Sequence, residues 1–451
     1  MKIKICQTRL ITLLAIILII AMCMVNAQPT NMITIQNTGQ ISTTKIWAKS
    51  GYWQDIQAAI VAVTAAGGGE VYIPEGVWNF VNAGESWSGS RVNVPAGVSI
   101  FGAPTNKTSG LPYDGVGMNP NDQVVEWKTV LVIPWDLPSN DNVGIKNMFR
   151  IYGTGDPAKP SRISDIKFVG YRSINSSSTQ MPRAIRIEWV ANFRVDHCYF
   201  ENMAGGGVVA FGRAPGGNTY GWSPCYGVID HCYFVNSIGL VAPYNSRTVD
   251  YGVFVARAYG DWWDDNVTNI FGKYTEYTVF VEDCYFSKWR HCTAASDGAH
   301  YVLRHSTIEN SYAYGDIDAH GTAQVQNGVI TRVGTRAVEI YNCKIINGVN
   351  QPYGQVYAAF IRGGAGIAFN NTVGGGVYVY FIQLSNEAPA EVSKCWINDW
   401  YIWSNTMLNG RIEVTVSGDG NIQEGVNYFR YAPSWYTPYL YPHPLTLGKT
   451  S

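Results

Sequence analysis

Short apolar runs recur from residue 163 onward with a constant pattern. It reads apolar, polar, polar, small or cysteine, any residue, apolar. The members are ISDIKF (163–168), VDHCYF (195–200), IDHCYF (229–234), VEDCYF (281–286), LRHSTI (303–308), IYNCKI (340–345), AFNNTV (368–373) and VSKCWI (392–397). They follow one another at intervals of roughly 20 to 50 residues, which indicates a solenoid with one structural turn per repeat.

The repeat predicts a right-handed parallel β-helix, an all-β fold, because alternate strand residues share a face and the first and sixth positions can stack into a core. The fourth position would lie at a tight corner, where a small side chain turns inward. That column would hold Cys198, Cys232, Cys284, Ser306, Cys343, Asn371 and Cys395. Stacked residues lie about 4.8 Å apart, so a disulfide is conceivable. We nevertheless expect buried free thiols that pack as small apolar groups.

A polar column is expected beside that corner. His197, His231 and His305 all occupy the third position of the repeat. A regular column of polar residues is more typical of the turn architecture than of a site. We therefore interpret these histidines as structural.

The chain before the repeats predicts a short helix and then short strands. Helical spacing is seen at Ile56, Ala59, Ile60 and Val63. Gly67-Gly68-Gly69 ends this helix, and Val71–Ile73 forms a strand. Such a helix would cap the first turn, whose apolar end would otherwise be exposed. Strands are also expected at Val98–Phe101 and Thr129–Ile133, separated by a Gly-, Pro- and Asn-rich insert, residues 102–125.

The two ends of the chain differ from the repeats. Basic residues precede an apolar run from Leu10 to Val25, and a small-residue site ends at Ala27. Residues 1–27 are therefore predicted to be a secretory signal peptide; the alternative, a membrane anchor, needs a longer apolar run. Residues 421–451, rich in aromatic residues and proline, are predicted to form an extended C-terminal tail. Residues 28–420 would form one β-helical domain, capped at about residues 52–80.

Composition narrows the function. Only 14% of the residues are charged, 46% are hydrophobic, and the net charge is −1. The chain therefore has no electrostatic footprint for nucleic acid. No later run is long and apolar enough to span a membrane. We expect a secreted or cell-surface monomer without a transmembrane span in the mature chain.

Reactive side chains concentrate between residues 280 and 321, a stretch that holds four of the seven histidines. The candidate catalytic residues are Arg290, His291, Arg304, Asp316, Asp318 and His320. The last three alternate, so in a strand they would share one face. Candidate substrate-binding residues are Arg332 and Arg336, with Trp262 and Trp263 able to stack on sugar rings. The alternative is that these residues are polar columns on an exposed face, or a loop packed on its own aromatic residues.

The cap motif IQAAI…AAGGGEVYIPEGVW and the VDHCYF-type repeats resemble the right-handed parallel β-helix proteins of the pectate-lyase superfamily. The resemblance covers roughly residues 52–410 and leaves the subfamily open. It implies a secreted protein that binds a polysaccharide in a groove along one face. The arginine-rich catalytic phrase of pectate lyases and the Asn-Thr-Asp, Gly-His-Gly and Arg-Ile-Lys motifs of polygalacturonases are absent.

Two functions remain open. The first is a polysaccharide-active enzyme, a lyase rather than a hydrolase, acting on a uronate-type or other extracellular polysaccharide, with or without calcium. The second is a non-catalytic glycan-binding or structural cell-surface protein. Clustering of Arg304, Asp316, Asp318 and His320 in one groove would favour the enzyme, and their scatter over different faces would favour the binding or structural role.

Overall fold

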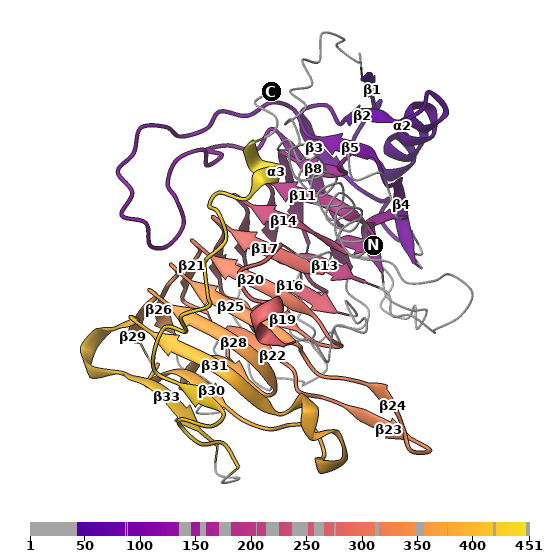
Figure 1. Cartoon of the computed structure of the whole chain (residues 1–451). Helices are drawn as coiled ribbons and strands as arrows, with labels where there is room; N and C mark the ends of the chain where they lie inside the picture. The colour runs from indigo at the N-terminus through magenta and orange to yellow at the C-terminus, as the bar shows by residue number, and fades with distance from the viewer. Residues whose placement is uncertain are drawn as a thin grey trace, which may run out of the picture. The chain divides into compact units, whose positions relative to one another are not determined.

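The protein is described by a computed structural model (Figure 1). It describes residues 43–447, apart from residues 86, 88, 135–145, 154–158, 171–181, 204, 213–224, 237–250, 257–265, 275–276, 312–314, 349–355, 377 and 418–420. The predicted signal peptide and the two tryptophans Trp262 and Trp263 lie outside the described residues. No helix among the described residues is long and apolar enough to cross a membrane.

Three parallel sheets run the length of the described chain, and each complete turn contributes one strand to each sheet; β1 (Thr44–Trp47) and β34 (Tyr428–Phe429) at the two ends extend sheet A alone. Sheet A contains β1 (Thr44–Trp47), β2 (Gly69–Tyr72), β5 (Val98–Phe101), β8 (Arg162–Ser164), β11 (Ala191–Asp196), β14 (Tyr226–Asp230), β17 (Thr278–Glu282), β20 (His300–Arg304), β25 (Ala337–Tyr341), β28 (Gly364–Phe369), β31 (Ile397–Trp403) and β34 (Tyr428–Phe429). Sheet B contains β3 (Gly76–Asn79), β6 (Thr129–Val132), β9 (Ile166–Val169), β12 (Tyr199–Glu201), β15 (Tyr233–Val235), β18 (Tyr285–Ser287), β21 (Thr307–Glu309), β26 (Lys344–Gly348), β29 (Thr372–Gly376) and β32 (Thr406–Met407).

Sheet C contains β4 (Ser90–Pro95), β7 (Asn147–Tyr152), β10 (Arg183–Glu188), β13 (Val208–Phe211), β16 (Tyr251–Ala256), β19 (His291–Ala295), β22 (Ile317–Ala319), β27 (Tyr357–Ile361), β30 (Tyr380–Leu384) and β33 (Ile412–Val416). A separate hairpin, β23 (Gln324–Gln326) and β24 (Val329–Arg332), is antiparallel. The inward residues of the three sheets form one continuous apolar core. The predicted right-handed parallel β-helix is confirmed.

The corner between sheets A and B explains the repeat. Its third position has a left-handed backbone in seven of the eight predicted repeats, at Asp165, His197, His231, Asp283, His305, Asn342 and Asn370. Asn and Asp tolerate this conformation best. The following residue then turns inward, as the fully buried Cys198 and Cys232 do. The tight corner therefore lies one position earlier than predicted, and the inward fourth position is confirmed.

The cysteines of this column are free and buried, as expected. The prediction fails for Cys395, which lies in a short 3-10 helix, η4 (Ala390–Cys395), before β31. Asn405 takes the inward place in that turn, and its side chain accepts hydrogen bonds from Asn371 at 2.9 and 3.0 Å. The phrase VSKCWI matches the repeat by composition alone, because the proline-flanked η4 shifts the register of the last turn.

The predicted cap is confirmed. The helix α2 (Trp53–Ala65) buries the four residues that follow helical spacing, Ile56, Ala59, Ile60 and Val63. It packs on β1, β2 and β4 and covers the first turn. Its last carbonyls accept hydrogen bonds from the backbone amides of Ala66, Gly67 and Gly68. Gly67 has a φ of 93°, which glycine adopts without strain.

The C-terminal segment is extended, as expected, and runs back along the outer face of sheet A (Figure 1, yellow). Tyr436 donates to Glu339 of β25 at 2.8 Å. Tyr441 donates to Asp283 at 2.8 Å, directly after β17. The backbone amide of His443 donates to Glu282 of β17 at 2.9 Å, and the short helix α3 (Pro444–Leu447) lies against β14. The tail thus covers several successive turns.

Candidate functional site

A polar cluster lies on the outer face of sheet C. The register aligns Ala294 of β19, Asp318 of β22 and Phe360 of β27 in one outward row. The row that precedes it pairs Tyr251 of β16 with His291 of β19. His320 and Arg362 directly follow β22 and β27, where the strands end. We call Tyr251, His291, Asp318, His320 and Arg362 the Asp318 cluster.

Asp318 is the centre of this cluster. Its carboxylate is fully buried and lies 2.9 Å from Nε2 of His320 and 2.8 Å from Nη2 of Arg362. Burial disfavours its ionisation, but the neighbouring cations outweigh burial and hold the pKa of Asp318 well below its usual range. Asp318 is therefore a permanent anion that holds His320 and Arg362 in place.

His320 and Arg362 carry the accessible surface of the cluster. Their side chains are 18% and 17% exposed, whereas that of Asp318 is 0% exposed. Arg362 also contacts Nδ1 of His320. An arginine can only donate, so Nδ1 accepts this contact, while Nε2 lies 2.9 Å from Asp318 and 3.2 Å from the same arginine nitrogen. The imidazole is thus held in place by two partners, Asp318 and Arg362.

Tyr251 supplies a hydroxyl beside this imidazole. Its Oη lies 3.3 Å from Nε2 of His320. Burial raises the pKa of Tyr251 above its ordinary value, so the hydroxyl keeps its proton at neutral pH. The guanidinium of Arg290 lies over the Tyr251 ring, 5.9 Å from its centroid. A phenol, an imidazole and two guanidinium groups therefore meet within one small patch.

His291 has a different character. Its Nδ1 donates to the carbonyl of Gly315 at 2.5 Å, and its Nε2 lies 3.6 Å from Asp318. Burial, with the charge of Arg290, lowers the pKa of His291 to about 3. His291 is therefore neutral at neutral pH, and it packs beneath the patch.

The predicted residues divide into two groups. Arg290, His291, Asp318 and His320 do come together. The expected proximity of Arg304 is wrong, because Arg304 lies on sheet A, fully buried, 2.6 Å from Glu282. Asp316 does not share the exposed face either. Its carboxylate is buried at the bend before β22 and accepts from the Tyr378 hydroxyl, and burial raises its pKa to about 8.

The two predicted substrate-binding arginines are also apart from the cluster. Arg332 lies on the β23–β24 hairpin, and its Nε donates to Asp297 at 2.6 Å. Arg336 directly precedes β25 in sheet A and is only 6% exposed. Their predicted role in sugar binding stays untested.

Sequence reasoning missed Tyr251 and Arg362. The repeated phrase locates the strands of sheets A and B, whereas both residues belong to sheet C. Loops of different length separate the phrase from the third strand in each turn. One signal was available: YAAFIRG (357–363) can be aligned with GDIDAHG (315–321), which places Arg362 beside His320.

The cluster does not fit calcium, which takes six to eight oxygen ligands. Asp318 is occupied by Arg362 and His320. The next carboxylate, Glu387, is bound to Arg362 at 3.1 Å and to the Gly321 amide at 2.9 Å. The guanidinium of Arg362 and the imidazole of His320 therefore occupy the carboxylate oxygens that a calcium ion would need.

The chain is a right-handed parallel β-helix protein. No family model and no curated protein matches it. Similar solved structures include an alginate lyase from a Paenibacillus species, with a TM-score of 0.43, 12% identity, and coverage of 83% of this chain and 99% of that one. A tailspike protein of an E. coli bacteriophage has a TM-score of 0.46 and 16% identity, and covers 85% of this chain. The match spans 60% of the tailspike chain.

A mannuronan C-5 epimerase A-module from Azotobacter vinelandii has a TM-score of 0.33 and 12% identity, with coverage of 85% of this chain and 97% of that one. At identities this low, the likeness concerns the fold alone.

Proposed function

We propose that the protein is a secreted enzyme that acts on a uronate-type polysaccharide by proton abstraction and β-elimination, with the Asp318 cluster as its active site. One observation carries the proposal: a phenol, an imidazole held by Asp318, and a guanidinium meet at a partly exposed point on one sheet face. Elimination from a uronate needs a cation for the carboxylate, a base for the C5 proton and an acid for the leaving oxygen.

The roles follow from the contacts. A substrate carboxylate competes with His320 for Arg362, since a guanidinium prefers a carboxylate in bidentate geometry. When Arg362 turns to the substrate, the Nδ1 lone pair of His320 becomes free to accept the C5 proton. Asp318 stabilises the imidazolium that forms. Tyr251, which keeps its proton at neutral pH, donates to the leaving oxygen. Arg290 adds positive charge beside Tyr251.

Hydrolysis is less well supported by the same geometry. It needs two carboxyl groups that face each other across the sugar. Within the cluster only Asp318 is a carboxylate, and it is fully buried. Glu387 is engaged by Arg362 and by a backbone amide.

The test is incubation of the protein with a panel of uronate polysaccharides. The ultraviolet absorbance of unsaturated ends reports elimination, and reducing-sugar release reports any chain cleavage. We expect both signals on at least one polymer, and Arg362→Met to remove both. The matched control is Arg430→Met, which removes a half-exposed guanidinium that pairs with Glu424 at 3.3 Å. Reducing ends without the absorbance would exclude elimination.

The alternative is a non-catalytic glycan-binding or structural protein. The separation of Arg304 and Asp316 from Asp318 and His320 supports this alternative. Binding to a polymer of the panel, measured by affinity electrophoresis, without either product signal would support that alternative and overturn the catalytic proposal.

A further inference from the structure

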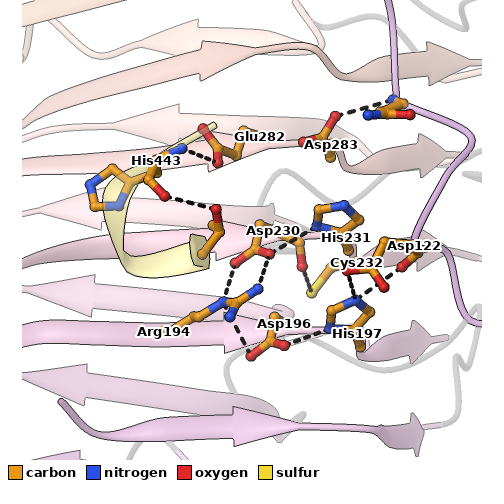
Figure 2. A network of polar contacts seen from close by, with 12 residues as sticks. Asp122, Arg194, Asp196, His197, Asp230, His231, Cys232, Glu282, Asp283 and His443 are labelled. Carbon is orange, nitrogen blue, oxygen red and sulfur yellow. Dashed lines mark hydrogen bonds and ion pairs between the residues drawn. The ribbon is translucent and has the colours of Figure 1, made fainter. Parts of the chain in front are cut away.

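A second polar group lies at the corner between sheets A and B, directly after β11 and β14 (Figure 2). His197 and His231 occupy the same corner position in consecutive turns, and their rings stack with centroids 5.0 Å apart and an interplanar angle of 18°. Asp122 reaches this pair from the insert 102–125, far away in sequence. One donor atom from each of the three residues lies within 4.8 Å of the others.

The distances match those between ligands of one small ion. Nε2 of His197 lies 3.2 Å from Oδ2 of Asp122 and 3.0 Å from the Asp122 carbonyl oxygen. Two ligands at zinc bond lengths of about 2.0–2.2 Å, set at a tetrahedral angle, are about 3.3 Å apart. Small movements of the side chains would therefore place an ion between the imidazoles and the carboxylate.

Both histidines are oriented as metal ligands usually are. Nδ1 of His197 lies 2.5 Å from Asp196, and Nδ1 of His231 lies 2.8 Å from Asp230. A carboxylate on one ring nitrogen directs the lone pair of the other outward and raises its basicity. Here Nε2 of His197 faces Asp122 (Figure 2), and among the described residues Nε2 of His231 has no hydrogen-bond partner.

The supporting carboxylates are themselves held firmly. Asp196 and Asp230 are fully buried. Arg194 donates to Asp230 at 2.7 and 2.9 Å, and Arg162 donates to Asp196 at 2.6 Å. These bonds keep both carboxylates ionised and fixed, so the imidazoles they orient are preorganised. The side chains of His197 and His231 are only 1% and 9% exposed.

We propose that Asp122, His197 and His231 form a binding site for one divalent transition-metal ion of the zinc type. Two imidazoles and one carboxylate suit Zn²⁺, whereas Ca²⁺ prefers an all-oxygen shell. The Asp122 carbonyl oxygen or a water would complete the coordination. Lys107 contacts the other carboxylate oxygen, Oδ1, at 3.6 Å, so Oδ2 is left to the ion.

The ion would fasten the insert to the β-helix. The insert runs along the same corner, where the Asn119 amide donates to Asp283 at 3.1 Å and the Met118 amide to Thr307 at 3.0 Å. Near the middle of the insert, the Tyr113 hydroxyl lies 2.7 Å from Nδ1 of His305. The proposed site therefore clamps one end of a segment that spans several turns, and this role is independent of the proposed enzymatic function.

The test uses the full chain, stripped with a chelator and titrated with Zn²⁺ by calorimetry, with Co²⁺ absorption spectra as a second measure. We expect one ion per chain, a higher Tm with Zn²⁺, and a tetrahedral-type Co²⁺ spectrum. Asp122→Asn and His231→Gln should each weaken binding about 10-fold or more. The matched control, His305→Gln, changes the same corner column two turns away from His231 and should leave binding unchanged.

Absence of Zn²⁺ binding by the wild-type chain would overturn the proposal, and so would binding that Asp122→Asn and His231→Gln leave intact. Asp122 lies on the insert and its side chain is half exposed, so Asp122→Asn should leave the fold intact. A loss of binding in this variant therefore reports loss of a ligand and not loss of folding. Equal weakening by the control would also overturn the assignment.

Discussion

Two buried carboxylate–guanidinium pairs of this protein differ in one respect. On sheet C, Arg362 lies 2.8 Å from Asp318, and on sheet A, Arg304 lies 2.6 Å from Glu282. Both carboxylates are fully buried, but Arg362 is 17% exposed and Arg304 is 0% exposed. The same chemical pair is therefore open to a ligand on one sheet and closed on the other.

The C-terminal tail makes the difference. Arg304 donates to the carbonyl oxygens of Tyr439 and Leu440 at 3.2 and 3.0 Å, so the tail uses the donors that a substrate would need. Aromatic residues of the tail then pack over the pair; the Tyr439 ring, for example, lies 4.8 Å from that of Phe280. A cluster of charged residues in the sequence can therefore form a binding site only where no other segment of the chain covers it.

The largest expected effect is on catalysis at the open pair. His320→Ala should lower the rate of formation of unsaturated ends about 10²- to 10⁴-fold, because the base is lost. The free energy of unfolding, measured by urea denaturation, should stay close to that of the wild type, because His320 is partly exposed. The matched control is His305→Ala, which removes a corner imidazole and should leave the rate per folded molecule unchanged. A rate within threefold of wild type in His320→Ala would exclude the assigned role.

At the closed pair the effect should be on stability. Arg304→Ala leaves Glu282 as a buried, unpaired charge, which costs about 3–5 kcal/mol in the free energy of unfolding. The activity of the folded fraction should not change. Arg332→Ala, which breaks the partly exposed pair with Asp297, should cost at most about 1 kcal/mol. Urea midpoints measure both. Equal urea midpoints for Arg304→Ala and Arg332→Ala would contradict the expectation that the buried pair contributes more to stability than the partly exposed pair.

Where the tail docks, stability should depend on pH. Burial raises the pKa of Asp283 to about 7, above the usual value of about 3.9 for an unfolded aspartate. The folded state therefore binds a proton more tightly, and this contribution to stability is complete below about pH 4 and lost as the pH rises to about 7. Asp283→Asn should remove it, with a relative gain on the order of 2 kcal/mol at pH 8 compared with pH 5.

Urea midpoints of Asp283→Asn and wild type at the two pH values test this dependence. A constant difference between the two proteins would show that Asp283 is ionised in both states. Tyr441→Phe, which removes the hydroxyl that donates to Asp283, serves as the control for a lost hydrogen bond without a lost titrating group.

The smallest effect is expected at Asp316. Burial raises the pKa of this carboxyl to about 8, so it is largely protonated at neutral pH and resembles an amide. Asp316→Asn should therefore change activity less than twofold and unfolding free energy by about 1 kcal/mol or less at pH 6. Kinetics and urea denaturation check this expectation. A loss of activity comparable with that of His320→Ala would show that Asp316 takes part in catalysis.

The fold was predictable to the level of individual turns because every turn of a solenoid needs the same residue types at the same corner positions. The left-handed corner selects Asp, Asn or His at one position, and the next residue must be small enough to turn inward. The exception, Cys395, has the right composition without the corner backbone. The candidate site was half predictable: Asp318 lies on β22 and His320 directly follows that strand, two residues later, so the sequence alone places them side by side.

By itself, the sequence determined the β-helix, its cap, the extended tail and the local pairing of Asp318 with His320, because these depend on local periodicity and corner geometry. The tertiary structure alone decided that Tyr251 and Arg362 complete the Asp318 cluster, since stacking joins strands across loops of unequal length. It also decided that the tail covers Arg304 and that the insert brings Asp122 to His197. Such contacts between distant segments leave no periodic signal, because each occurs only once in the chain.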